Sequence, residues 1–255
     1  MTRRRFFAPR SHFAPDESTV ALASDEARHL RDVLRLRTGD EVFVFDGEGR
    51  EFRCLVEESG RNGTTLDILA EVEPARPESL LQLTLAVALL KGEKFELVVQ
   101  KATELGASRI TPVITQFADV RLRDKADVER RVLRLRRIVI EACKQSGRAR
   151  LPSIDWPALF LSLIKSAPAA GPREWRAMFA ERGGLSLRET VGQLPARPES
   201  VTALVGPEGG WADEEIALAL EAGWSVVTLG GRTLRAETAA VTVSALLQHL
   251  FGDLV

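Results

Sequence analysis

The chain has 255 residues, of which 45% are hydrophobic and 28% charged, and its formal net charge is −1, a composition typical of a globular protein with one large or two modest domains. Its two cysteines, Cys54 and Cys143, lie far apart and outside any metal-ligand spacing, so neither a disulfide framework nor a zinc site is expected. No apolar stretch approaches the roughly 20 residues that span a bilayer, and the basic N-terminus lacks a secretory apolar segment, so we expect a cytoplasmic protein.

Residues 1–73 are predicted to form a small domain rich in β-structure. Ser24, Asp25 and Glu26 provide a helix start, and the apolar spacing continues to Leu34 before Gly39 ends the helix. Hairpin-type turns rich in glycine then separate three predicted strands, Glu41–Phe45, Glu51–Glu57 and Thr64–Val72. A compact, largely antiparallel barrel is the expected closure.

Residues 74–79 contain two prolines and are predicted to link this domain to a second one, which extends over residues 74–255. Strands and helices alternate there, which favours an α/β domain with a mainly parallel sheet. The near-continuous apolar run Leu81–Leu90 is typical of a strand covered on both faces. Further predicted elements are the helices Lys94–Leu105 and Asp127–Ser146 and the strands Ile110–Ile114 and Ala177–Ala180.

Two glycine loops near the C-terminus each follow a short apolar run and lead into a predicted helix. The first is Gly206-Pro207-Glu208-Gly209-Gly210, and the second begins at Gly230-Gly231-Arg232. A strand, a tight glycine loop and a helix start form a pocket in which backbone N–H groups can meet a ligand. Neither the G-x-G-x-x-G fingerprint after the first strand nor a G-x-x-x-x-G-K-[ST] loop is present, which disfavours a conventional nucleotide fold.

Charge is strongly segregated along the chain. Residues 121–150 carry eleven Lys or Arg against four Asp or Glu, and residues 1–10 carry four arginines and no acid. Residues 200–255 carry seven acids, and their only basic side chains are Arg232 and Arg235, both in the second glycine loop. Local basic clusters in a near-neutral chain indicate an anionic partner such as RNA. The alternative for the helix Asp127–Ser146 is an ordinary solvated face.

The motifs LVGPEGG, LGGRTLRAETA and LLQHLFGDL closely resemble the RsmE family, whose members methylate N3 of a uridine in small-subunit (16S) ribosomal RNA. The resemblance covers nearly the whole chain in order. It includes Arg4-Arg5-Phe6-Phe7, Lys101-Ala102-Thr103-Glu104-Leu105-Gly106 and the segment from Glu141 to Arg148. The chain departs from the family at Ala236, where threonine is usual, and at Lys144, where glutamate is common.

The resemblance implies an N-terminal PUA-like barrel and a C-terminal SPOUT methyltransferase domain with a deep trefoil knot. It also implies S-adenosylmethionine (SAM) as methyl donor, a homodimer, and ribosomal RNA or the small subunit as partner. No metal is required, because the sulfonium methyl is itself the electrophile. The cofactor-binding candidates are Phe179, Ala180, Leu204, Val205, Gly206, Glu208, Gly209, Gly210, Leu229, Gly230, Leu234, Ala236 and Thr238.

Methylation at N3 requires loss of its proton, which places negative charge on the two uracil oxygens. A fixed guanidinium stabilises that charge, and Arg235 is the first candidate for this role, with Arg5 second, either there or on a flanking phosphate. Glu237 is a candidate base, although an acid in the first turn of a helix is more often a partner of the helix dipole.

Contacts with RNA are expected from arginines in two basic clusters and from the second glycine loop. In residues 3–10 the arginines accompany Phe6 and Phe7, a combination suited to phosphates and to stacking on a splayed base. The candidates are Arg3, Arg4, Arg10, Arg121, Arg123, Arg148, Arg150 and Arg232.

Two other functions stay open. One is a SPOUT enzyme with a different acceptor, such as a ribose 2′-OH or a transfer RNA base. The other is a non-catalytic RNA-binding assembly factor that keeps the fold but does not bind SAM.

Overall fold

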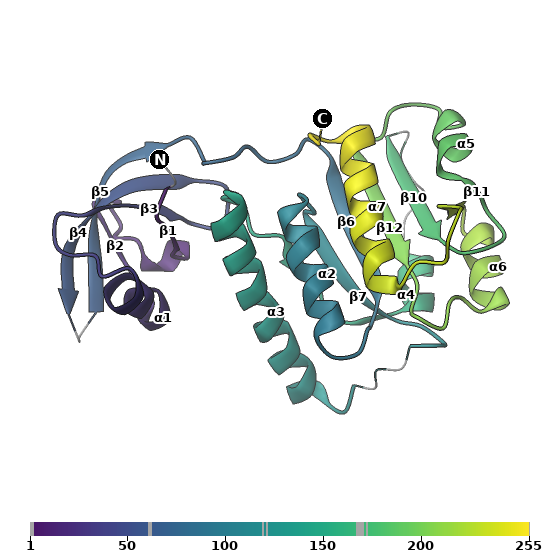
Figure 1. Ribbon diagram of the computed structural model, residues 1–255, viewed down its shortest axis with the longest axis horizontal. Helices are drawn as coiled ribbons and strands as arrows, with labels where there is room; N and C mark the ends of the chain where they lie inside the picture. The colour runs from purple at the N-terminus through teal and green to yellow at the C-terminus, as the bar shows by residue number, and fades with distance from the viewer. Residues whose placement is uncertain are drawn as a thin grey trace. The chain divides into compact units, whose positions relative to one another are not determined.

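A computed structural model of the chain describes residues 3–60, 63–118, 120, 122–166, 171 and 173–254 (Figure 1). The chain divides into two compact units, one made of residues 1–78 and 140–151 and the other of residues 79–139 and 152–255. Residues 140–151, which the sequence assigns to the second domain, pack within the first unit.

The first unit is built on a five-stranded sheet with the strand order β1-β3-β4-β5-β2. All its pairings are antiparallel except that of β1 with β3. The strands are β1 (Arg5–Phe7), β2 (Thr19–Ala21), β3 (Glu41–Phe45), β4 (Glu51–Gly60) and β5 (Gly63–Val72). Alternate strand residues enter one core, which contains Phe6, Val44, Phe52 and Leu66.

Short helical segments complete the first unit. They are η1 (Arg10–His12), α1 (Ser24–Arg28) and the π-helical turn η2 (His29–Val33). Of these, α1 and η2 together cover the predicted helix. The residue at the N-cap of α1 is Ala23 and not Ser24, and no side-chain hydrogen bond caps this end. Leu30 of η2 is fully buried in the core of the unit.

Arg5 lies at the middle of a buried hydrogen-bond network in the first unit, and its side chain is 4% exposed. Its Nε and Nη2 donate to the carboxylate oxygens of Glu51 at 3.0 and 3.1 Å, and Phe45 lies 4.6 Å below the guanidinium. Nη1 donates to the carbonyl oxygen of Cys143 at 2.6 Å and Nη2 to that of Arg148 at 2.9 Å. Cys143 belongs to the last turn of α3 (Lys125–Ser146), whose final carbonyls have no partner within the helix. These bonds explain why residues 140–151 pack with the first unit.

The second unit contains an eight-stranded sheet in which every pairing is parallel, as the sequence predicts. Its main path is β11-β13-β10-β12-β6-β7-β8, and β9 also pairs with β7. The strands are β6 (Gln82–Ala88), β7 (Arg109–Ile114), β8 (Ser153–Ile154), β9 (Ala158–Leu159), β10 (Glu174–Phe179), β11 (Leu185–Ser186), β12 (Ser200–Val205) and β13 (Ser225–Thr228).

Helices cover the sheet of the second unit, and its central strands β6, β10 and β12 are largely buried. Figure 1 shows α2 (Glu93–Glu104) and α7 (Ala236–Phe251) side by side in front of the sheet. A buried cluster joins β6, β10, β12 and β13 to α4 (Phe160–Ser166) and α6 (Asp213–Glu221). The elements α4, β11 and α5 (Leu187–Gly192) are not predicted from the sequence. No helix of the described residues combines the length and apolar character of a membrane span.

Replacing Arg5 by alanine should strongly destabilise the first unit, because Glu51 is fully buried and would lose its buried, doubly bonded partner, which leaves it only the partly exposed Arg3 at 3.4 Å. Breaking a buried pair in this way costs about 3–5 kcal/mol. Arg4→Ala is the matched control, since Arg4 is exposed and lies in the same basic run, so a change within about 0.5 kcal/mol is expected. Urea unfolding followed by circular dichroism measures the free energy of unfolding of both variants. Equal stability of the two would contradict the role given to Arg5.

Candidate functional site

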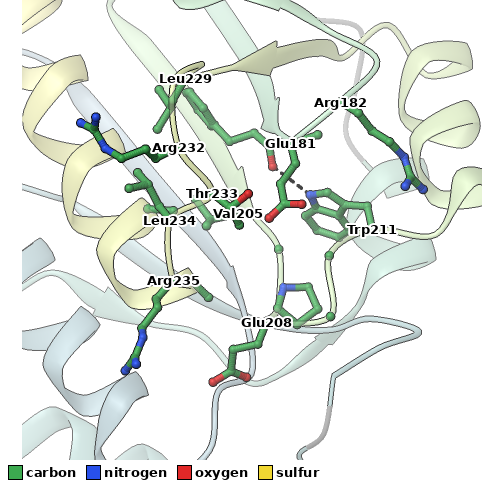
Figure 2. Close-up of a pocket in the computed structure, with 18 of the residues that line it drawn as sticks. Glu181, Arg182, Val205, Glu208, Trp211, Leu229, Arg232, Thr233, Leu234 and Arg235 are labelled. Carbon is green, nitrogen blue, oxygen red and sulfur yellow. Dashed lines mark hydrogen bonds between the residues drawn. The ribbon is translucent and has the colours of Figure 1, made fainter.

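A pocket of about 680 Å³ lies in the second unit at the carboxyl ends of β10, β12 and β13, which are neighbours in the sheet. Ligands of open α/β sheets bind at this edge. Both glycine loops line the pocket, so Gly209 and Arg235 lie at one site (Figure 2). The lining residues are Phe117, Phe179, Ala180, Glu181, Arg182, Val205, Gly206, Pro207, Glu208, Gly209, Gly210, Trp211, Ile216, Leu229, Gly230, Gly231, Arg232, Thr233, Leu234, Arg235, Ala236 and Ala239.

The first glycine loop has no room for side chains at two of its positions. A Cβ on Gly206 would lie 2.9 Å from the indole Cε2 and Nε1 of Trp211, and one on Gly209 would lie 3.0 Å from Cβ of Phe117. Gly210 has φ +74°, a conformation that side chains disfavour. The loop therefore presents backbone rather than side chains along much of its length.

Trp211 connects the first glycine loop to the end of β10 by a hydrogen bond. Its indole Nε1 donates to the carbonyl oxygen of Phe179 at 2.8 Å, the bond drawn as a dashed line in Figure 2. The indole also packs against Phe160, with ring centroids 5.6 Å apart. Because Trp211 is only 6% exposed, the bond is shielded from water and fixes two pocket walls relative to each other.

The second glycine loop leads directly into α7. Gly230 and Gly231 both have positive φ, +70° and +73°, and the N–H of Arg232 donates to the carbonyl oxygen of Gly230 at 3.0 Å. Arg235 occupies the N-cap position, so the N-terminus of α7 lies at the pocket. The unpaired N–H groups and the dipole of such a helix end attract negative charge. Ala236 is buried and offers no hydroxyl, which leaves only backbone contacts at that position.

Charged side chains surround the pocket on several sides. Glu208 accepts a hydrogen bond from Lys94 of α2, which raises the pKa of this lysine above its usual value. The charge of Glu237 acts in the same direction, and that of Arg235 opposes it. In Figure 2 the Glu181 side chain points into the pocket, whereas that of Arg232 points away. Glu181 has no hydrogen-bond or ion-pair partner among the described residues.

Most of the predicted cofactor-binding residues line this pocket, as do Arg232 and Arg235. Leu204 does not, because it is fully buried in the core, and Thr238 is exposed on α7 outside the lining. Glu237 also lies outside the lining, and its Oε2 is buried without a hydrogen-bond partner in the described chain.

Several lining residues are not among those predicted from the sequence. Glu181 and Arg182 directly follow the predicted strand Ala177–Ala180, and Trp211 directly follows the first loop, so proximity in sequence could have indicated them. Phe117 gave no such signal, because it follows β7, which is separated from β12 by β6 in the sheet.

The structure corrects the roles predicted for several arginines. Arg5 is enclosed in the first unit with its guanidinium bonded to Glu51 and to backbone carbonyls, which contradicts contact with uracil or phosphate. Arg148 is 5% exposed and paired with Glu78 at 2.6 Å, so an RNA contact is contradicted there too. Phe6 is fully buried and cannot stack on a base.

The other candidate arginines differ in their exposure and in whether they bond to another residue of the protein. Arg3 donates to the carbonyl oxygen of Glu73 at 2.8 Å, and Arg10 is paired with Glu17. Arg121 lies outside the described residues. Exposed candidates are Arg4, Arg123, Arg150 and Arg232.

Comparisons with known proteins agree with this arrangement. The RNA methyltransferase domain family matches residues 77–248. The RNA methyltransferase PUA domain family matches residues 22–69, which confirms the PUA-like character expected of the N-terminal part.

Relatives match over most of the chain. The ribosomal RNA small subunit methyltransferase E of Synechocystis sp. is 34% identical over 92% of this chain and 74% of its own length. The protein of the same name from Mycobacterium bovis is 36% identical, with coverages of 89% and 85%. Among solved structures, a ribosomal RNA small subunit methyltransferase E from Neisseria gonorrhoeae bound to S-adenosyl methionine has a TM-score of 0.86 and 31% identity, covering 99% of this chain and 100% of that one.

Placing a methyl group at position 206 should strain the pocket, because its Cβ would collide with the buried indole of Trp211. Overpacking of this kind costs about 1–3 kcal/mol, and we expect Gly206→Ala to lower the thermal midpoint by roughly 2–10 °C. Gly192→Ala is the matched control, since a Cβ there meets no atom within 4 Å. If calorimetry gave both variants the same midpoint, the tight contact between this loop and Trp211 would be refuted.

Proposed function

We propose that this chain, which belongs to the ribosomal RNA small subunit methyltransferase E family, transfers the methyl group of SAM to N3 of a uridine in 16S ribosomal RNA. The family membership follows from the match over residues 77–248 and from relatives more than 30% identical over most of the chain. The single observation that carries the proposal is the meeting of both glycine loops and Arg235 at one pocket.

The pocket fits SAM in size and in chemistry. Its volume of about 680 Å³ lies within the range of small-molecule sites. The crowded glycines leave backbone N–H and C=O groups of both loops available to an adenine and a ribose, and Phe179 and Leu229 supply apolar walls. When bound, SAM supplies an electrophilic methyl group on a sulfonium. The predicted cofactor-binding residues that line the pocket are proposed to hold SAM. They are Phe179, Ala180, Val205, Gly206, Glu208, Gly209, Gly210, Leu229, Gly230, Leu234 and Ala236.

Arg235 is proposed to stabilise the negative charge that develops on the uracil oxygens when N3 loses its proton. It lies at the N-cap of α7, where the helix dipole adds to the positive potential. A guanidinium is an effective donor in such a site because it carries a permanent positive charge and several N–H groups. The buried, fully bonded state of Arg5 leaves Arg235 as the one remaining candidate of the predicted pair.

The RNA is proposed to contact the exposed arginines Arg4, Arg123, Arg150 and Arg232, with the half-buried Arg3 and Arg10 as weaker candidates. The PUA domain match supports RNA as the partner of the first unit. The family resemblance further supports a homodimer, a trefoil knot in the second domain, and activity in the cytoplasm, where ribosomes are assembled.

Purified protein should transfer labelled methyl groups from SAM to small ribosomal subunits or 16S RNA that lack the modification. Nucleoside mass spectrometry of the product should then give 3-methyluridine. Formation of a 2′-O-methylated nucleoside would contradict the assigned acceptor. Failure to retain labelled SAM would contradict the enzymatic function and favour an RNA-binding assembly factor.

Arg235→Ala should lower the rate of methyl transfer by about 10²- to 10³-fold, because one charge-stabilising donor is lost. SAM affinity should stay within about threefold, since the predicted cofactor contacts are to backbone groups. Arg188→Ala on α5 is the control, because Arg188 is exposed and outside the pocket. Single-turnover kinetics and calorimetric SAM titration test both points, and an unchanged transfer rate in Arg235→Ala would remove Arg235 from the mechanism.

A further inference from the structure

We propose that Phe117 is the platform on which the target uracil stacks during methylation. This inference rests on the proposed function, and it gives that function a binding surface for the unpaired base. The supporting observations are the exposure of the Phe117 ring, its place on the pocket lining, and the hydrogen bonds that fix its loop.

Phe117 differs from the other aromatic residues of the pocket. Phe179 and Trp211 are 7% and 6% exposed and belong to its walls, whereas Phe117 is 46% exposed. Among the described lining residues it is the one aromatic side chain with a large solvent-exposed area. An exposed apolar ring at a ligand pocket is unfavourable in water and gains when a flat partner covers it.

The loop that carries Phe117 is held in place by a buried carboxylate. Glu215 is 6% exposed, and its Oε1 accepts the backbone N–H of Gln116 at 3.0 Å. Its Oε2 accepts the N–H of Ala212 at the start of α6, at 3.1 Å. Through these two hydrogen bonds, Glu215 connects the loop after β7 to the start of α6, the helix that follows the first glycine loop. The Cβ and Cγ of Phe117 lie 3.0 and 3.7 Å from where a Cβ on Gly209 would be, so the side chain begins directly beside that loop.

The chemistry of the acceptor calls for a surface of this kind. N3–H of uracil is the donor on the base-pairing edge, so a paired or stacked-in uridine cannot present it to a methyl donor. Enzymes that modify bases take the target out of its stack and hold it against aromatic or apolar side chains. RNA-binding proteins likewise stack splayed bases on exposed aromatic rings. With Phe6 buried, Phe117 is the residue placed to do so beside the cofactor pocket.

Stacking is attributed to the RNA base and not to the adenine of SAM because of where the ring lies. Phe179 is 7% exposed and belongs to the pocket wall, whereas Phe117 is 46% exposed, so the Phe117 ring is open to a partner that arrives from solvent. Loss of Phe117 should therefore affect RNA and leave cofactor binding unchanged.

The test uses the full-length protein and four substitutions, Phe117→Ala, Phe117→Leu, Phe117→Tyr and Phe117→Trp. Methyl transfer to unmodified small subunits gives kcat/KM for the RNA, calorimetry gives the SAM affinity, and sedimentation gives the mass of the assembly. We expect a loss of about 10- to 100-fold in kcat/KM for the alanine and leucine variants, as base–aromatic stacking implies. The tyrosine and tryptophan variants should stay within about threefold of wild type, and SAM affinity within about twofold throughout.

Leu220→Ala on α6 is the matched control, because Leu220 is 52% exposed and outside the pocket lining, and its activity should be unchanged. A leucine variant as active as wild type would show that the ring face is not needed and overturn the proposal. A parallel fall in SAM affinity would assign Phe117 to the cofactor instead, and an altered assembly mass would assign it to a subunit contact. If wild-type protein transfers no methyl group, the proposed function itself fails, independently of Phe117.

Discussion

The site depends on the convergence of three neighbouring strand ends, β10, β12 and β13, at one edge of a parallel sheet. Parallel strands bring their carboxyl ends to the same edge, so segments distant in sequence meet there without further adjustment. The hydrogen bond from Trp211 to the carbonyl oxygen of Phe179 then fixes the first glycine loop to the adjoining strand end.

The sequence predicted the parts of the structure that local chemistry determines. Apolar runs located β6, β7 and β12, and glycines followed by helix signals located both pocket loops. Residues 151–200 were harder, because α4, β11 and α5 are too short to show a clear period. Phe117 and Glu215 could not be predicted as neighbours, since the hydrogen bond that joins their segments connects residues 116 and 215 and depends on the sheet order.

The arginines also show that local sequence does not determine how a side chain is used in the fold. A basic run in sequence predicts positive potential, but it does not tell which guanidinium groups the protein uses internally. Arg5 and Arg148 are held by Glu51 and Glu78, two acids far from them in the chain, so both serve the packing of the first unit. Arg235 remains at the pocket, at the start of α7. Tertiary pairing therefore separates arginines that are bonded inside the protein from arginines that stay exposed, although both share one sequence signal.

The central claim is that the two glycine loops form a single SAM site beside Arg235. Amide hydrogen exchange with and without saturating SAM tests it most directly, because backbone N–H groups are the predicted contacts. The account predicts that exchange slows together at the amides of residues 206, 208–210 and 230–236, with little change in the first unit. Slowing in only one loop, or in neither, would contradict a shared site.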